Sequence, residues 1–519
     1  MVMRVTQQSL YGTVIRQANS TLLDLVETNQ QISTEKRINK PSDDPTGTVT
    51  VLNTRSDISR LTQYQSNITQ ASGWLTQEDD TLSSVNTLVT SIKSLAEQAA
   101  TGSMTDSNRS EIATQVRQYF EQLISLANTT YSGQSLFSGQ KTDTEAYSES
   151  LWMTSNDDTF DAAVASNGGF TISGDADYTV LVQFSSSNAA THQPSFRYSL
   201  DGGHSWVSNA TYATSPSADR QILNLGSGLT VEIPNAALDT VTSSSTTNDA
   251  AGTWLWIRPT AVYQGNDNDT VTVTSANNKT VTGSASGTFS SNVVVRVDGD
   301  TSFASGSTFS YSYSLDGGSS WVSGNTSGVC DGSNATLTVP GGILTLSANG
   351  GSLSSGSEFF IQPSTADITI AISDSDSVVV NGVGKDIFGG VYQATGASNA
   401  SVVTFGGSDA SNLFETVGKL IGYLETNNED GIADCVDDLT ASQERIVNAS
   451  TSVGGKENRV SSAETVVETL SDNATTTLSN VEDADITTLI TKLAQQELAY
   501  QAVLKSSSMV IDMSLLNYI

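Results

Sequence analysis

The sequence predicts an α+β protein of several domains, in which long helices from both ends of the chain pair as a coiled-coil or helical-bundle stem and a β-rich region is inserted between them. Three observations support this class. Both ends carry apolar residues at spacings of three and four, residues 456–519 contain no Gly or Pro, and most of the 41 glycines lie in the middle. A length of 519 residues predicts about three domains.

Net charge excludes several classes of partner. The chain carries 55 acidic against 23 basic residues, a formal charge of −32. Binding of nucleic acid or of an anionic membrane needs clustered Lys and Arg, which are not present. No apolar run approaches the roughly 18–20 residues that span a bilayer. The start of the chain lacks an apolar segment followed by small residues, so we expect no cleaved signal peptide.

The N-terminal part is predicted to hold three helices, over about 10–36, 46–100 and 106–130. Asp106 or Ser107 is expected to cap the third. Between the first two lies a corner in which two prolines stop the helix, the Ser and Asp side chains can cap backbone N–H groups, and the second proline suits a first helical turn. The corner residues are Pro41, Ser42, Asp43, Asp44 and Pro45.

From about 142 to 407 the apolar period changes to two, which predicts strands. An eleven-residue segment beginning at Tyr198 recurs 115 residues later at Tyr313 with ten identities. We therefore expect two related β sub-domains, over about 169–259 and 287–363. Each repeated hairpin should place an Asp on turn N–H groups, a Gly at positive φ and a Trp beneath the turn. These residues are Asp201, Gly203, Trp206, Asp316, Gly318 and Trp321.

Helices are predicted to resume near Asp409, with a short one over about 413–424 and a second from about Gly431. The pair Gly454 and Gly455 is expected to separate a third helix, which continues to the C-terminus. The third is apolar over more than one stripe, so it should pack on more than one neighbour.

Chemistry for catalysis is not visible in the sequence. His192 and His204 lie in Ser/Gly-rich segments without metal-ligand spacing, and Cys330 and Cys435 are too far apart in the chain to form a zinc motif. We expect no enzyme activity, no cofactor and no metal. The repeated Ser-x-Asp-x-Gly-x-Ser-Trp segment resembles the Asp-box of sialidases, which leaves a surface glycan-binding protein as an alternative from another functional class.

Both ends resemble the flagellar hook-associated protein 3 family, the flagellin-like hook–filament junction proteins. The resemblance rests on Met3-Arg4-Val5-Thr6-Gln7, on the segment from Lys36 to Pro45, and on the last six residues, Ser-Leu-Leu-Asn-Tyr-Ile. It covers about 1–139 and 412–519 and does not extend to the middle. The flagellin corner Ser-Ala-x-Asp-Asp-Ala is absent.

The resemblance implies a structural, secreted protein of bacterial motility. It would leave the cell by flagellar type III export without signal cleavage and form a homo-oligomeric ring, with another hook-associated protein on the hook side and flagellin on the filament side. An export chaperone would bind the C-terminal helix. Residues 1–40 and 482–519 would form an inner coiled-coil domain, 41–140 and 409–481 an outer helical domain, and 141–408 the inserted region. A flagellin filament subunit is the nearest alternative.

Heptad-like spacing selects the apolar residues that should pair between the ends and then between subunits. Many neighbouring seam positions are Thr, Asn or Gln, so these helices are expected to need partners to fold. The predicted interface residues are Leu10, Val14, Leu22, Leu25, Ile32, Leu489, Leu493, Tyr500, Leu504, Ile511, Leu515 and Leu516.

Overall fold

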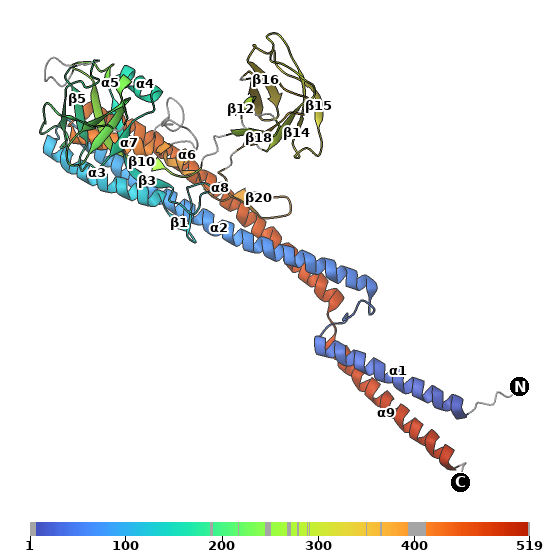
Figure 1. The fold of residues 1–519 in the computed structure, drawn as a ribbon. Helices are drawn as coiled ribbons and strands as arrows, with labels where there is room; N and C mark the ends of the chain where they lie inside the picture. Colours follow the sequence, from blue (N-terminus) through green and yellow to red (C-terminus); the bar gives the residue numbers. More distant parts are fainter. Residues whose placement is uncertain are drawn as a thin grey trace. The chain divides into compact units, whose positions relative to one another are not determined.

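The computed structural model describes residues 7–516, apart from 187–189, 216, 244–250, 267–270, 278–279, 288, 290, 349, 364–365 and 393–411, with side chains described over 12–509 (Figure 1). Long N-terminal helices, many antiparallel strands and a C-terminal helix follow one another along the chain, which confirms the predicted α+β class. The chain divides into two units. Unit 1 comprises 1–72, 370–378 and 458–519, and unit 2 comprises 73–369 and 379–457.

Within the described residues, six helices are longer than three turns, and three are short. The long helices are α1 (Gln7–Thr34), α2 (Pro45–Ala99), α3 (Asp106–Ala127), α7 (Leu413–Glu425), α8 (Glu429–Glu482) and α9 (Ile486–Leu516). The short helices, which the sequence did not predict, are α4 (Asp158–Ser166), α5 (Asn235–Leu238) and α6 (Gly384–Phe388). The predicted caps of α3 were wrong by one residue, because the side chain of Thr105 accepts the bond from the Asn108 N–H, at 3.3 Å.

The predicted break at Gly454 and Gly455 is also wrong, because α8 continues through both glycines. A Gly costs a helix about 1 kcal/mol relative to Ala, which burial of an apolar stripe can offset. Such a stripe crosses the glycines at intervals of seven residues, and all of its members are buried. They are Ile446, Val453, Val460 and Val467.

In unit 2, one β core lies between two sheets. The first sheet has the order β21-β10-β5-β6, with β3 also paired to β10, and the second has the order β4-β9-β8-β7. All pairs are antiparallel except β10 with β21. The strands are β3 (Tyr147–Ser155), β4 (Thr171–Ser173), β5 (Val180–Phe184), β6 (Phe196–Ser199), β7 (Tyr212–Ala213), β8 (Arg220–Asn224), β9 (Thr230–Pro234), β10 (Trp254–Tyr263) and β21 (Val391–Tyr392).

A second β core also lies between two sheets, of order β11-β18-β13-β14-β15 and β12-β17-β16. Its strands are β11 (Val271–Ser275), β12 (Thr282–Gly287), β13 (Val293–Val297), β14 (Ser310–Ser314), β15 (Val322–Thr326), β16 (Asn334–Val339), β17 (Gly342–Ser347) and β18 (Glu358–Pro363). Two small hairpins complete the fold, β1 (Thr130–Tyr131) with β2 (Gln134–Ser135), and β19 (Thr369–Ala371) with β20 (Ser377–Val379).

Both cores extend beyond the segments marked by the internal repeat. The first core includes Met153 and Phe160, which precede residue 169, and the second includes Val281 and is packed by Val271, which precede residue 287. Strand β3 supplies Met153 and strand β11 supplies Val271, each strand being an antiparallel neighbour of the strand that ends its repeat, whereas Phe160 lies on α4 and Val281 immediately precedes β12. The repeat therefore marks a shared hairpin and its sheet, and the edge strands lie outside it.

Candidate assembly interface

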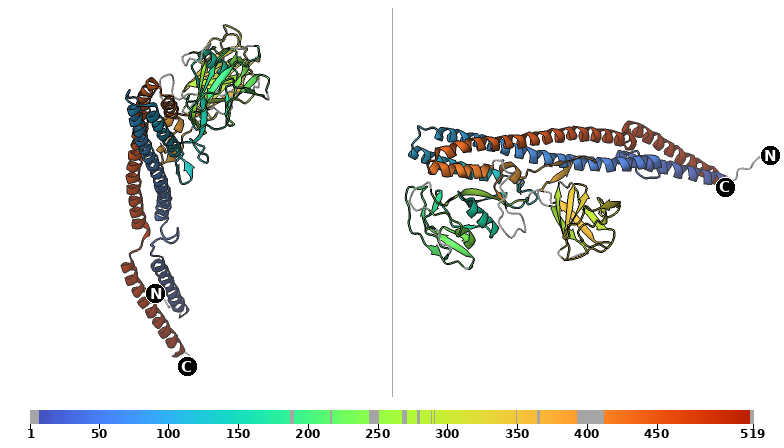
Figure 2. Two further views of the ribbon diagram at one scale, coloured as in Figure 1. Left: turned by 90° about the vertical axis from the view of Figure 1, so that its left-hand side faces the viewer. Right: turned by 90° about the horizontal axis from the view of Figure 1, so that it is seen from above.

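Helices α1 and α9 of unit 1 lie side by side and run antiparallel (Figures 1 and 2). The less exposed positions of each helix alternate by four and three, as in a coiled-coil seam. On α1 the positions in this pattern are Val14, Ala18, Thr21, Leu25, Thr28 and Ile32, with Gly12 and Gln31 partly buried outside it, and on α9 they are Ile486, Leu489, Leu493, Gln496, Tyr500, Val503 and Ser507. Of these apolar residues only Leu489 is fully buried.

The seam is interrupted by polar side chains. Thr21 and Thr28 occupy buried positions on α1, and Gln496 lies in the seam of α9. Within the described residues, Thr28 Oγ1 and Gln496 Oε1 have no hydrogen-bond partner. An unpaired buried polar group costs free energy on folding, so this pair of helices is weak by itself.

The predicted interface residues divide into three groups. Val14, Leu25, Ile32, Leu489, Leu493 and Tyr500 lie in the seam. Leu22 and Leu504 do not, because they are 42% and 47% exposed, and Thr21 and Val503 take the seam positions beside them. As contacts between subunits, all the predicted residues remain a prediction. The side chains of Leu10, Ile511, Leu515 and Leu516 lie outside the described residues.

A second apolar stripe follows the seam on each helix. Ile15 and Leu22 on α1, and Ile490 and Leu504 on α9, each come one residue after a seam position and are exposed. In heptad terms all four are e positions, and the e positions of two antiparallel helices lie on the same side of the pair. The same positions also carry the polar Asn29 and Glu497, so this side of the α1/α9 pair combines four exposed apolar side chains with two polar ones. The opposite side carries Gln17, Asp24, Gln31, Lys492, Ala499 and Ser506.

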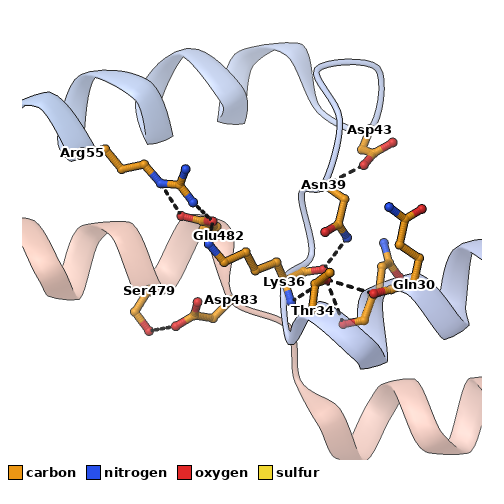
Figure 3. A network of polar contacts seen from close by, with 10 residues as sticks. Gln30, Thr34, Lys36, Asn39, Asp43, Arg55, Ser479, Glu482 and Asp483 are labelled. Carbon is orange, nitrogen blue, oxygen red and sulfur yellow. Dashed lines mark hydrogen bonds and ion pairs between the residues drawn. The ribbon is translucent and has the colours of Figure 1, made fainter.

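At one end of the pair, the corner after α1 is bound to the turn between α8 and α9 (Figure 3). The Arg37 N–H donates to the carbonyl of Glu482 at 2.7 Å, and the Ala484 N–H donates to the carbonyl of Glu35 at 3.0 Å. Arg37 also donates through its guanidinium to the carbonyl of Val481, at 2.6 Å. Backbone hydrogen bonds thus join the segment that follows α1 to the turn that precedes α9.

Glu482 is the charged centre of this corner. Its side chain is 3% exposed and forms ion pairs with Lys36 and with Arg55 on α2. Arg55 Nε also donates to Glu482 Oε2 at 3.2 Å. Glu482 is not among the site residues that the sequence predicts. Its one signal is position, since it precedes the Asp-Ala-Asp turn at which α8 ends.

Inside the corner, the predicted aspartates bind backbone N–H groups. Asp43 accepts from the N–H groups of Lys40 and Asn39, at 2.8 and 3.0 Å, and these bonds lower its pKa. Asp44 accepts from the Gly47 N–H at 2.9 Å, which lowers its pKa. The corresponding cap of α9 is Asp485, whose pKa is lowered chiefly by Thr488.

The remaining corner residues lie in the loop or at the start of α2. Pro41 and Ser42 are exposed in the loop, and Pro45 is the first residue of α2. Gly47 is needed for space, because a Cβ there would lie 2.6 Å from Ile38 Cδ1 and 2.5 Å from Asp44 Oδ2. A small residue at the start of α2 thus allows the loop to fold back on the helix.

The two repeated hairpins have the same hydrogen bonds. In the second, Asp316 accepts from the N–H and the hydroxyl of Ser320, at 2.8 and 2.6 Å, and from the Ser314 hydroxyl at 2.7 Å. These bonds lower the pKa of Asp316 to about 2. Asp201 makes the equivalent bonds with Ser205 and Ser199. Gly203 and Gly318 have φ of +105° and +96°.

Trp206 and Trp321 lie half-buried beside their hairpins, and each stacks on an arginine. Arg197 lies 4.1 Å from the centre of the Trp206 ring, and Arg296 lies 4.0 Å from that of Trp321. In the register of the repeat, Arg197 corresponds to Ser312 and Arg296 corresponds to Gln183. The arginine of the second copy therefore lies on the strand next to the one that carries it in the first copy. The arginine–tryptophan stack is present in both copies. The repeat gives no sequence signal for this arginine–tryptophan pair, because the arginine occupies different positions in the two copies.

The described part of the chain lacks both a metal-binding cluster and a membrane-spanning helix. No group of three or more His, Cys, Asp or Glu there is placed to hold a metal ion. Among the described helices, none is long and apolar enough to cross a membrane.

Known proteins share the N-terminal part of the chain. The family described as the bacterial flagellin N-terminal helical region matches residues 5–142. Flagellar hook-associated protein 3 of Escherichia coli (strain K12) is 30% identical over 148 residues, which are 28% of this chain and 47% of that protein. Its counterpart in Salmonella typhimurium is 27% identical over the same shares. Flagellin A of Helicobacter pylori (strain 26695) is 31% identical over 29% of this chain and 31% of that flagellin.

Among solved structures, a putative flagellar hook-associated protein from Vibrio parahaemolyticus has a TM-score of 0.38 at 12% identity, covering 85% of this chain and all of that one. FlgL of Xanthomonas campestris has a TM-score of 0.30 at 13% identity, covering 81% and 98%. The chain spans about half the length of the curated hook-associated proteins it matches. The resemblance of this chain to the flagellar hook-associated protein 3 family is confirmed.

Proposed function

We propose that this protein is a structural component of the bacterial flagellum that joins the hook to the flagellin filament by self-assembly of its terminal helices. One observation carries the proposal: α1 and α9 pair along a weak seam and leave apolar residues exposed on one side. Burial of a Leu or Ile side chain contributes about 1.5–3 kcal/mol, so covering this side by neighbouring subunits favours assembly. The pair would thus act as a coiled-coil stem that is completed in the assembled state.

The finer organisation belongs to the same proposal. Residues 1–40 and 482–519 would form the inner domain, 41–140 and 409–481 the outer helical domain, and 141–408 the inserted region with two related β sub-domains. The break between α8 and α9 at 483–485 supports the boundary at 482. The Glu482 corner would set the angle between the inner and outer helices. The subunits would form a ring, with another hook-associated protein on one side and flagellin on the other.

Export through the flagellar type III apparatus and binding of a chaperone to the C-terminal helix complete the proposal. The mature protein would be extracellular, without cleavage of a signal peptide, and would have no enzymatic activity, cofactor or membrane contact. Resemblance to a structural flagellar family supports this assignment.

Immunolabelling of isolated flagella tests the location. A single spot beside the hook is expected, and labelling along the whole shaft would contradict the junction role. It would instead support the second candidate, a filament subunit, which the similarity to Helicobacter flagellins favours. The glycan-binding alternative is not favoured, since an arginine already stacks on each hairpin tryptophan.

A variant pair tests the mechanism. Leu22→Glu places a charge on the side of α1 that exposes Ile15 and Leu22 and should abolish incorporation into flagella, whereas Gln17→Glu on the opposite side should not. The six tryptophans all lie between residues 74 and 321, within unit 2. Tryptophan fluorescence can therefore show that unit 2 remains folded in both variants. Normal incorporation of the Leu22→Glu variant would contradict the mechanism.

A further inference from the structure

The carboxyl group of Glu78 is buried within unit 2 without a bond to one of its oxygens. Glu78 lies on α2 and is 1% exposed, and its Oε2 has no hydrogen-bond partner among the described residues. Trp74 lies one turn earlier on the same face of α2. It is also buried, and its Nε1 has no partner there either, so the indole N–H does not bond the carboxyl group. An ionised carboxylate is costly to bury without such bonds, which favours the protonated form.

The Glu78 carboxyl group lies against the segment 380–387, which includes α6. A Cβ atom on Gly382 would lie 2.5 Å from Glu78 Oε1, so only a glycine leaves room for the carboxyl group at this point. The same Cβ atom would lie 2.8 Å from Ile387 Cδ1 and 3.3 Å from Phe137 Cδ1. Backbone and apolar side chains thus meet a titratable group of α2 directly.

Other bonds of this segment lead away from α2. The Gly384 N–H donates to the carbonyl of Phe137 at 2.8 Å, and the Val380 N–H donates to the carbonyl of Ile368 at 2.9 Å. Neither bond involves α2, so the contact with that helix depends on the packing around Gly382. A charge that appears at this contact therefore acts where the segment approaches the helix.

The charge of Glu78 depends on burial and on two neighbouring charged groups. Burial raises its pKa to about 7; Lys456 of α8 lowers this pKa and Asp79 of α2 raises it. Asp79 accepts a hydrogen bond from the Ser450 hydroxyl at 2.7 Å. Lys456 is the cation to which an ionised Glu78 would be attracted.

The other charged groups on the elements packed here have partners or are exposed. On α8, Glu457 accepts from the Thr76 hydroxyl at 3.1 Å. On α6, the Lys385 ammonium lies 5.0 Å from the centre of the Tyr392 ring, and Asp386 is exposed. None of these three groups is a cause of the pKa shift described above.

We propose that Glu78 is a proton-dependent latch that holds the segment 380–387 against α2. While the carboxyl group is neutral, Gly382 and Ile387 pack against it beside Phe137. When the group loses its proton, the charge turns towards water and Lys456, and the segment separates from α2. The segment connects β20 to β21, so the latch controls how firmly this part of the β-rich region is held on the helices.

Hydrogen exchange of the full-length protein, measured from about pH 5 to about pH 8, tests the latch. The closed state holds a proton that the open state releases, so opening should become about tenfold more frequent for each pH unit up to about pH 7. The protection factors of the Gly384 and Val380 amides measure this opening after correction for the intrinsic effect of pH. Constant protection below pH 7, or protection equal to that of α3 at pH 7, would overturn the proposal.

Glu78→Gln is the decisive variant, because an amide side chain stays neutral at every pH. Between pH 5 and pH 7 the unaltered protein should lose about a hundredfold in protection of the segment, and the variant should lose less than about twofold. Glu97→Gln, at an exposed position of the same helix, is the matched control and should keep the original profile. The same loss in Glu78→Gln would assign the opening to another group and contradict the latch.

Lys456→Met gives a second test that leaves the Glu78 side chain in place. Removal of this cation disfavours the ionised carboxylate, so the pH at which protection stops falling should rise. An unchanged pH would contradict the proposed attraction of the released carboxylate to Lys456.

Discussion

The α1/α9 pair of unit 1 and the α3 and α7 helices of unit 2 are both amphipathic, yet they differ in how much they bury. Helix α3 buries eight residues and α7 buries ten. Over the described side chains of α1 no apolar residue is fully buried, and on α9 only Leu489 is. Helices α3 and α7 find all their partners within the chain. The α1/α9 pair leaves more of its apolar surface exposed, and the proposed completion of this pair by other subunits rests on that difference.

The charged residues of the two regions differ in the same way. Glu425 of α7 binds Arg117 of α3 through two bonds of 2.7 and 3.0 Å and accepts a third from the Thr179 N–H at 2.6 Å. Glu482 in the corner is as buried, but its partners Lys36 and Arg55 are 40% and 48% exposed. Solvent weakens such pairs, so the corner should open more readily than the α3/α7 contact.

The largest expected effect is in the unit 2 core. Phe414 packs on Phe120, Tyr147 and Phe388 and is buried. Phe414→Ala should lower the free energy of unfolding by about 3–5 kcal/mol, measured by urea denaturation with tryptophan fluorescence. Leu23→Ala on α1, at an exposed position, is the control and should change it by less than about 0.5 kcal/mol. Equal losses would remove the contrast between the regions.

The free energy of unfolding is expected to depend on pH through Glu78 of α2, which lies in unit 2. Burial raises its pKa to about 7; Lys456 lowers it and Asp79 raises it. The folded state then holds a proton that the unfolded state releases above its ordinary pKa of about 4.3. Stability should thus fall by about 1.4 kcal/mol per pH unit as pH rises towards 7. Glu78→Gln should abolish this slope in urea titrations; an unchanged slope would assign it to other groups.

In the corner, Glu482→Gln removes one charge from the ion pairs with Lys36 and Arg55. Because both cations are half-exposed, we expect a local loss of about 1–2 kcal/mol. Hydrogen exchange of the amides of Arg37 and Ala484 should become faster, while that of α3 should not change. Exchange that accelerates equally in α3 would show that the corner is not an independent element.

The smallest expected effect is a gain in the stability of the α1/α9 pair. Thr28→Val removes a buried hydroxyl without a partner among the described residues and keeps the shape of the side chain. We expect the α1/α9 pair to become more stable by about 1 kcal/mol, measured as slower hydrogen exchange along α1. Thr13→Val at an exposed position is the control. If Thr28→Val weakened the pair, its hydroxyl would have a partner in the folded subunit.

Much of the helical architecture could be predicted, because Pro45 and the apolar stripes act locally. The register of the seam could not, since Leu22 is more apolar than Thr21 and the choice depends on α9. The continuity of α8 through Gly454 depends on burial of Val453 and Val460. Glu482 has no sequence pattern, because its partners lie more than 400 positions away.

Hydrogen exchange of α1 and α9, compared between the free subunit and isolated flagella, tests the central claim most directly. In the free subunit these helices should exchange far faster than α3, and in the flagellum their protection should approach that of α3. Slow exchange of α1 and α9 in the free subunit, equal to that of α3, would contradict the claim that neighbouring subunits complete this pair.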